Sequence, residues 1–133
     1  MMKAKEPMHD HQTEHTGEIL SIIRSGASPL ALRERLEDYH ENDIASVLPE
    51  LQPAQRKKLY RVLNPEFLAE VFTYLDEEAG QFLAEMDVTR AVEVISRMDS
   101  DDAVTMLRQL SREKRDVFIR RYWYFDSIGA ICE

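Results

Sequence analysis

The sequence has little of what secreted or membrane-spanning proteins need. Its single cysteine, Cys132, cannot form a disulfide within the chain, which points to a reducing compartment. No apolar run approaches the ~20 residues that span a bilayer, and the first residues lack the apolar region of a signal peptide. We therefore expect a cytoplasmic protein without a membrane span.

Glycine, proline and positive charge are also scarce. Four glycines and five prolines in 133 residues argue against a loop-rich β fold, and no long period-two alternation predicts strands. The 17 basic residues are outnumbered by 25 acidic ones, giving a net charge of −8. This charge opposes binding to a nucleic-acid backbone or an anionic lipid surface and suits cations or basic partners.

Motifs that carry catalysis are missing as well. The chain has no G-x-S-x-G elbow, no phosphate-binding glycine loop and no H-E-x-x-H zinc motif. Cys132 lies near the C-terminus without an evident base beside it. His40, the only histidine of the periodic region, lies in a polar stretch between predicted helices. We expect a protein that is not an enzyme.

The first fifteen residues, "MMKAKEPMHDHQTEH", have almost no apolar periodicity and predict a disordered tail over residues 1–15. A metal-binding role is open for His9, His11 and His15, because the last two are one helical turn apart. The alternative is a polar leader. Nothing nearby would fix the backbone, and this favours the leader.

A helical pattern begins at Gly17. The segment "EILSIIR" is apolar on one face and ends at Ser25-Gly26, a typical C-terminal stop. Ser28-Pro29 then has the composition of a helix cap followed by the first helical residue.

From there the chain repeats itself about every twelve residues. Cap-type residues recur, each directly after an apolar residue, at Asn64, Asp76, Asp87, Asp99 and Ser111. Apolar pairs recur in the middle of the blocks, at Leu59-Tyr60, Val71-Phe72, Phe82-Leu83, Val94-Ile95, Met106-Leu107 and Phe118-Ile119. Each block predicts an amphipathic helix of about 8–10 residues with a side-chain cap.

Helices this short are marginally stable alone and must bury their apolar faces on their neighbours. Consecutive short helices of this kind form solenoids. The fold class is therefore all-α, with a helical-repeat domain over residues 16–122. Residues 123–133 are expected to begin a linker.

The stretch "RMDSDDAVTMLRQL", residues 97–110, places Asp99, Asp101 and Asp102 directly before a helix. Asp99 falls at the recurrent cap position, and the other two fall in the first helical turn, where carboxylates are favourable. The second interpretation is a cation site. Residues 65–102 hold eleven acidic residues against two basic ones, and repeats would gather these charges on one surface. The spacing fits no closed metal cage and suits Mg²⁺, which keeps most of its waters and takes one or two carboxylates.

Over about residues 19–121 the chain resembles the cytosolic N domain of MgtE-type magnesium transporters and channels. The resemblance lies in the repeat and in the segments "RMDSDDAVTMLRQL" and "LNPEFLAEVFTYLDEE". The final "YFDSIGAICE" resembles the entry into that family's first CBS domain. The resemblance implies a right-handed superhelix. It also implies that Mg²⁺ bridges carboxylates of this domain and neighbouring CBS domains, within a homodimer on the cytoplasmic face of the membrane, and so holds the pore shut.

By position, Asp101 and Asp102 match the family's acidic pair, and Glu70 matches a second acidic position facing the CBS side. Thr105 stands where the family often has a further acid, so one ion site is expected to be weakened or absent. Asp99 is included as a weaker ligand candidate, because the helix-cap interpretation explains it better. Mg²⁺ binding by this domain alone is expected to be weak and interfacial.

Two alternatives stay open. The chain could be a helical-repeat interaction scaffold without an ion role, as in flagellar rotor switch proteins, with its acidic surface bound to a basic partner. Separately, "RRYWYF", residues 120–125, could anchor to a membrane surface or cover the apolar end of the solenoid core. We favour the second interpretation, in which this apolar end covers the core before the linker.

Overall fold

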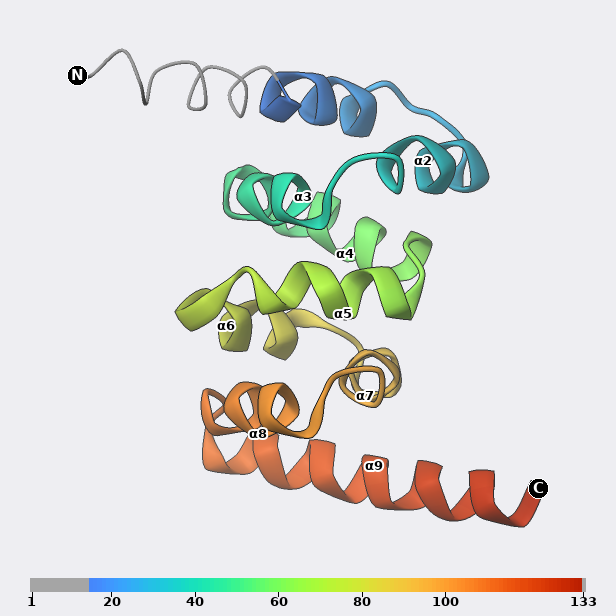
Figure 1. Cartoon of the computed structure of the whole chain (residues 1–133), viewed down its shortest axis with the longest axis vertical. Coiled ribbons are helices and arrows are strands. Elements are labelled where there is room, and N and C mark those ends of the chain that lie inside the picture. Colours follow the sequence, from blue (N-terminus) through green and yellow to red (C-terminus); the bar gives the residue numbers. More distant parts are fainter. Residues whose placement is uncertain (1–14, 133) are drawn as a thin grey trace. The chain divides into compact units, whose positions relative to one another are not determined.

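A computed structural model describes residues 15–132 of the chain; for residues 123–132 it describes the helical backbone only (Figure 1). Within this range every regular element is a helix and there is no strand, which confirms the all-α prediction. The chain divides into two compact units, with the boundary between Asn64 and Pro65. The superhelical arrangement of the repeats and the domain boundaries at 16, 122 and 133 stay predictions. The tail histidines His9 and His11 lie outside the described residues.

The first unit contains a helix over residues 15–24, then α2 (Pro29–Leu36), α3 (Glu41–Val47), the short 3-10 helix η1 (Leu48–Glu50) and α4 (Pro53–Val62). Helix α2 packs on α4, and the Arg33 Nε donates a 2.8 Å hydrogen bond to the Val62 carbonyl. The core of this unit contains Ile19, Leu32, Leu36, Val47 and Leu59, each at most 1% exposed.

Local signals start and stop these helices as the sequence predicts. Gly26 follows the first helix with a φ of 78°, a conformation that favours glycine because it has no Cβ. The Ser28 hydroxyl accepts a 3.2 Å hydrogen bond from the Ala31 amide at the start of α2. His40 caps α3, since its Nδ1 accepts from the Asn42 amide at 2.9 Å. His40, which the sequence placed in a polar stretch between helices, is therefore the N-cap of α3.

His15, the first residue that the structure describes, lies in a helix and contacts α3. Its Nδ1 lies 3.1 Å from the Asp43 Oδ2, and its ring meets the Tyr39 ring edge to face at 5.7 Å. These partners give His15 a structural role that requires no metal.

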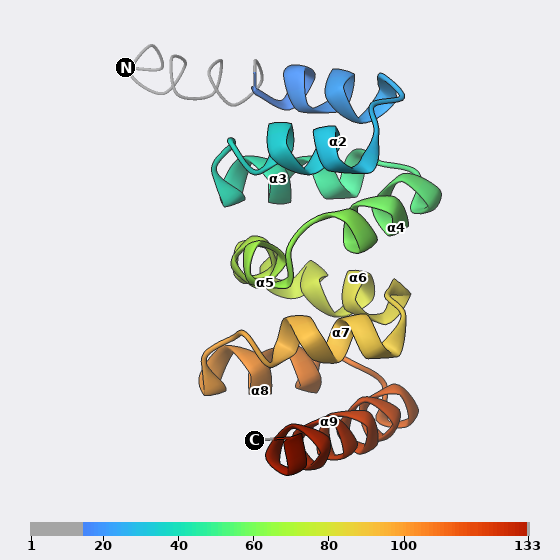
Figure 2. The same ribbon diagram turned by 90° about the vertical axis from the view of Figure 1, so that its right-hand side faces the viewer.

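The second unit contains α5 (Pro65–Thr73), the 3-10 helix η2 (Asp76–Glu78), α6 (Ala79–Glu85), α7 (Val88–Ile95), α8 (Ser100–Arg108) and α9 (Arg112–Cys132). Within this unit α5 packs on α7, α6 on α8, and α7 on α9. Each helix therefore contacts the helix two positions further along the chain, and Figure 2 shows α7 between α5 and α9. This alternation places η2 and α6 beside α8.

The repeated apolar pairs form the core, with a difference at the last two helices. Both members of the pair are buried in α4, α5, α6 and α7. In α8 and α9 only the first member is buried, since Met106 and Phe118 are 4% and 1% exposed whereas Ile119 is 48% exposed. The second members, Leu107 and Ile119, line a hollow among α7, α8 and α9 and lie nearer to solvent.

Helix α9 is longer than the repeat predicts. It has 21 residues, whereas the pattern predicted about 8–10. The sequence offers a reason: the twelve-residue spacing places Trp123 where the next cap-type residue after Ser111 would lie, so no new helix start interrupts α9 there. The helix thus continues through 123–132, where a linker was expected to begin, and through "RRYWYF", whose side chains beyond Tyr122 lie outside the description. No helix within residues 15–132 combines the length and apolar character needed to cross a bilayer.

Candidate functional site

The acidic residues at the start of α8 occupy the positions that the sequence predicts. Asp99 is the N-cap, with extended backbone (φ −63°, ψ 152°), and its carbonyl accepts the first helical hydrogen bond from the Ala103 amide at 2.9 Å. Its carboxylate, however, accepts no backbone hydrogen bond. Asp101 and Asp102 fall in the first turn, where the partial positive charge of the helix N-terminus favours carboxylates. The helix-start interpretation is therefore correct in position, without the side-chain bond that usually accompanies it.

Asp101 and Asp102 differ in their surroundings. Asp101 is exposed, whereas Asp102 is half-buried and lines a surface cleft. Thr105, one turn further on, also lines this cleft, and its hydroxyl donates a 2.9 Å hydrogen bond to the Asp101 carbonyl. Of the acidic pair, Asp102 is the residue that faces other functional groups.

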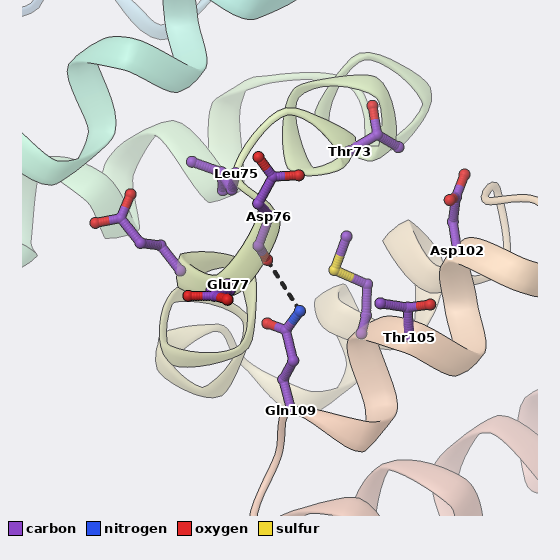
Figure 3. Close-up of a pocket in the computed structure, with 9 residues that line it drawn as sticks. Thr73, Leu75, Asp76, Glu77, Asp102, Thr105 and Gln109 are labelled. Atoms are coloured by element: carbon purple, nitrogen blue, oxygen red, sulfur yellow. Dashed lines mark hydrogen bonds between the residues drawn. The ribbon is translucent and has the colours of Figure 1, made fainter.

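The cleft has a volume of about 740 Å³ and lies between η2 and α8 (Figure 3). Its lining residues are Thr73, Leu75, Asp76, Glu77, Glu78, Asp102, Thr105, Met106 and Gln109. Figure 3 shows the Asp76 and Asp102 carboxylates on opposite sides of the cleft, with Thr105 and Gln109 on the α8 side. Four carboxylates from two elements therefore border one hollow.

Among the described residues no basic side chain pairs with these four carboxylates. The two basic residues of the acidic stretch are used elsewhere: Arg97 Nε lies 3.6 Å from the Glu66 Oε1, and Arg90 Nη1 lies 3.4 Å from the Glu93 Oε1. The cleft consequently carries uncompensated negative charge, and a cation or a basic partner would reduce this repulsion.

The acidic turn at η2 is a feature that sequence reasoning described incorrectly. Asp76 was predicted to be a helix cap, but it is the first residue of η2 and has a φ of 52°. The helix α6 that follows begins at Ala79, and its N-cap is Glu78, whose side chain makes no capping bond. The cap prediction for Asp76 is wrong because the turn η2 separates Asp76 from the first residue of α6, Ala79, so its side chain is not at the helix start. Only the run of three acids in "LDEE" signals that this turn is part of a charged surface.

Glu70 does not join the cleft. It lies exposed on α5, and its carbonyl accepts a 2.7 Å hydrogen bond from the Thr73 hydroxyl, but it does not line the hollow. Across residues 15–122, whose side chains the structure describes, no group of three or more histidine, cysteine or acidic side chains is arranged to hold a metal ion. Carboxylate oxygens are the donor type that Mg²⁺ prefers. The described carboxylates lie on an open surface, however, and do not by themselves form a complete ion site.

A second hollow of about 270 Å³ lies among α7, α8 and α9 and is mainly apolar. Its walls include Ile95, Val104, Leu107, Phe118 and Ile119. Tyr122, the first aromatic residue of "RRYWYF", lines this hollow and is 43% exposed. The described start of that segment thus lies beside the apolar core of the unit.

These features define a class of protein: an all-helical repeat domain of short consecutive helices with an acidic cleft on its surface. The chain belongs to the family of MgtE intracellular N domains, whose profile matches residues 39–122. No curated protein matches the sequence significantly.

A solved structure described as the soluble part of a magnesium transporter has the same fold. The match has a TM-score of 0.72 at 23% sequence identity and covers 83% of this chain. It covers 44% of the other chain, so the present sequence spans less than half the length of that relative. The match thus supports the fold, while the family is shown by the profile.

Proposed function

We propose that this chain is the regulatory cytosolic domain of a magnesium transporter or channel, and that its acidic surface responds to Mg²⁺. Membership in the MgtE N-domain family carries the proposal, and the solved magnesium-transporter structure with the same fold supports it. The observation on the chain itself is the acidic cleft, in which Asp102 faces the turn Asp76–Glu78 without a basic partner among the described residues.

In this proposal Mg²⁺ lies between this domain and CBS domains of the same transporter. Asp102 and Asp101 offer carboxylate oxygens from α8, Glu70 offers a second position on α5, and Asp99 contributes charge at the helix start. Because these residues form an open surface, further ligands come from the CBS side or from water. Bound ions would neutralise like charges on the two faces, hold the domains together and keep the pore closed. Loss of Mg²⁺ would let the faces separate.

The full transporter would act as a membrane homodimer, with this domain on the cytoplasmic face. Thr105 replaces a common acidic position of the family, and its hydroxyl is already engaged with the Asp101 carbonyl. A hydroxyl is a poorer Mg²⁺ ligand than a carboxylate, so we expect fewer ion sites, or weaker ones, than in relatives with an acid there.

The alternative is an interaction scaffold whose acidic surface binds a basic protein. One observation favours it: the carboxylates of the cleft are spread over two elements, and no three of the acidic, histidine or cysteine side chains described within 15–122 are arranged to hold a metal ion. A surface of this kind also suits lysine and arginine side chains, and its binding would depend on salt with no preference for divalent cations.

An NMR titration of the intact chain separates the two functions. Backbone amide shifts would be followed during addition of MgCl₂, with NaCl at equal ionic strength as the reference. The proposal expects saturable, Mg²⁺-specific shifts near Asp102 and the turn Asp76–Glu78, and a weaker response in Asp102→Asn. Asp116→Asn, an exposed acid on α9, is the matched control and should leave the response unchanged.

A response equal to that of NaCl would contradict an ion site held by this chain alone. The joint site is then tested by measuring binding of the chain to an isolated CBS pair from a magnesium transporter. Binding that strengthens with Mg²⁺ and weakens in Asp102→Asn supports the sensor. Binding that is indifferent to Mg²⁺ and falls with salt supports the scaffold.

A further inference from the structure

The turn at Asp76–Glu78 has a backbone hydrogen bond from the Glu78 amide to the Leu75 carbonyl at 3.0 Å, but no side-chain cap within η2. Asp76 has a φ of 52°, a left-handed conformation that is uncommon for residues other than glycine, although aspartate adopts it more readily than most. Helix α6 begins directly afterwards, and its N-cap residue Glu78 makes no side-chain hydrogen bond. The first amides of a helix have no partner within it, so some other group must satisfy them.

Gln109 supplies this group from the end of α8. Its Oε1 accepts a 2.7 Å hydrogen bond from the Gly80 amide, and its Nε2 donates a 2.9 Å hydrogen bond to the Asp76 carbonyl. One side-chain amide therefore binds both ends of the segment 76–80, and Figure 3 shows it reaching from α8 to the turn. A glutamine 29 residues away from Gly80 thus caps α6.

The backbone of α6 approaches α8 closely enough to make this possible. A Cβ added to Gly80 would lie 2.5 Å from the Cβ of Gln109 and 3.2 Å from its carbonyl oxygen. Any other residue at position 80 would push the two helices apart. Gly80 is therefore required for the close approach, and the glutamine for the hydrogen bonds that the approach allows.

We propose that Gln109 is a positioning residue: it caps α6 across the cleft and thereby holds the acidic turn Asp76–Glu78 at a fixed place opposite Asp102. The three carboxylates of the turn are exposed and would otherwise separate from Asp102 by repulsion. The two hydrogen bonds act against this separation. The consequence for Mg²⁺ binding rests on the proposed function, whereas the positioning itself does not.

The test compares three variants of the intact chain by NMR. Gln109→Leu removes both hydrogen bonds while keeping the approximate size of the side chain. Gln109→Glu keeps an acceptor for Gly80 but, when ionised, has no donor for the Asp76 carbonyl. Gln81→Leu changes an exposed glutamine of α6 and is the matched control.

The first readout is amide exchange at Gly80 together with the amide-to-α-proton coupling of Asp76, which reports its φ. In Gln109→Leu we expect faster Gly80 amide exchange and an averaged Asp76 coupling. In Gln109→Glu we expect a changed Asp76 coupling with little change in Gly80 exchange. In Gln81→Leu we expect neither change. Unchanged Gly80 exchange in Gln109→Leu, or equal changes in the control, would overturn the inference.

The second readout is the Mg²⁺ titration. If the parent chain responds, we expect the midpoint at Asp102 to rise several-fold in Gln109→Leu and to stay unchanged in Gln81→Leu. An equal midpoint in Gln109→Leu would overturn the link to ion binding. If the parent chain gives no Mg²⁺ response, this chain holds no ion site by itself, and Gly80 exchange still decides whether Gln109 positions the turn.

Discussion

Glu37, the C-cap residue of α2, binds Asn64 with both of its carboxylate oxygens. The Asn64 backbone amide donates to the Glu37 Oε2 at 2.9 Å, and the Asn64 side-chain amide donates to the Oε1 at 3.1 Å. Asn64 is one of the recurrent cap-type residues and is the last residue of the first unit. A charged acceptor thus fixes the backbone directly before Pro65.

Glu37→Gln should lower the free energy of unfolding by about 1 kcal/mol, because the amide keeps one acceptor and turns a second donor toward Asn64. The measurement is urea unfolding followed by circular dichroism. Glu34→Gln, an exposed acid on the same helix, is the control and should cost less than about 0.5 kcal/mol. Equal losses in both variants would assign no special role to the Glu37–Asn64 pair.

The two aspartate N-caps should differ in energy although the sequence treats them alike. The Asp87 carboxylate accepts a 3.2 Å hydrogen bond from the Thr89 amide, whereas the Asp99 carboxylate accepts none. Asp87→Ala should cost about 1 kcal/mol of unfolding free energy. Asp99→Ala should cost only a few tenths, from its favourable charge near the helix N-terminus. Equal costs, measured by urea unfolding, would show that the Asp99 carboxylate makes a capping hydrogen bond in solution.

The pKa of Tyr39 is raised above its ordinary value, because its hydroxyl donates a 2.7 Å hydrogen bond to the Glu18 carboxylate, with burial and the negative charge of Glu18 adding to the effect. A raised pKa means that folding favours the protonated phenol. The contribution of the Tyr39 hydroxyl to stability is therefore fully present below about pH 10, the ordinary pKa of tyrosine. This contribution is lost as the pH rises through the raised pKa.

Tyr39→Phe should therefore reduce stability at pH 7 by no more than about 1 kcal/mol, since the bond is exposed to solvent. The difference from the parent chain should shrink above pH 10. Unfolding free energies measured from pH 7 to pH 11 check this, with Tyr122→Phe as the control. A difference that is constant across this range would mean that the hydroxyl acts by packing.

Phe118 tests whether the first half of α9 belongs to the core of the second unit. It is 1% exposed on a helix that packs on α7. Phe118→Ala should cost about 3–5 kcal/mol through lost burial and the cavity left behind. Val117→Ala, at the neighbouring position that is 46% exposed, should cost less than about 0.5 kcal/mol. Similar losses would show that α9 packs differently in solution.

Much of the fold follows from the residues themselves. The twelve-residue spacing predicts the short helices, and Ser28, Asp87 and Ser111 lie at helix starts as expected, with Ser111 Oγ accepting from the Lys114 amide at 3.3 Å. The repeated apolar pairs predict the core through α7. These features depend on local hydrogen bonding and on the 3.6-residue period, which a single sequence contains.

The candidate site follows from the sequence only in part. The family resemblance selected Glu70, Asp99, Asp101 and Asp102, but the structure places only Asp102 of these in the acidic cleft. It adds Asp76, which the repeat predicts as a helix cap, together with Glu77 and Glu78. The ion site and the Mg²⁺ response remain predictions to be tested by the titrations above.

By itself, the sequence determines an all-α chain of short capped helices with one strongly acidic stretch, because composition, capping and periodicity are local properties. The tertiary structure alone decides which acids face each other, since this depends on α6 packing against α8. It also decides that Asp76 is left-handed and that Gln109 caps a helix 29 residues earlier in the chain. Such contacts join distant residues through side-chain geometry, which no spacing rule contains.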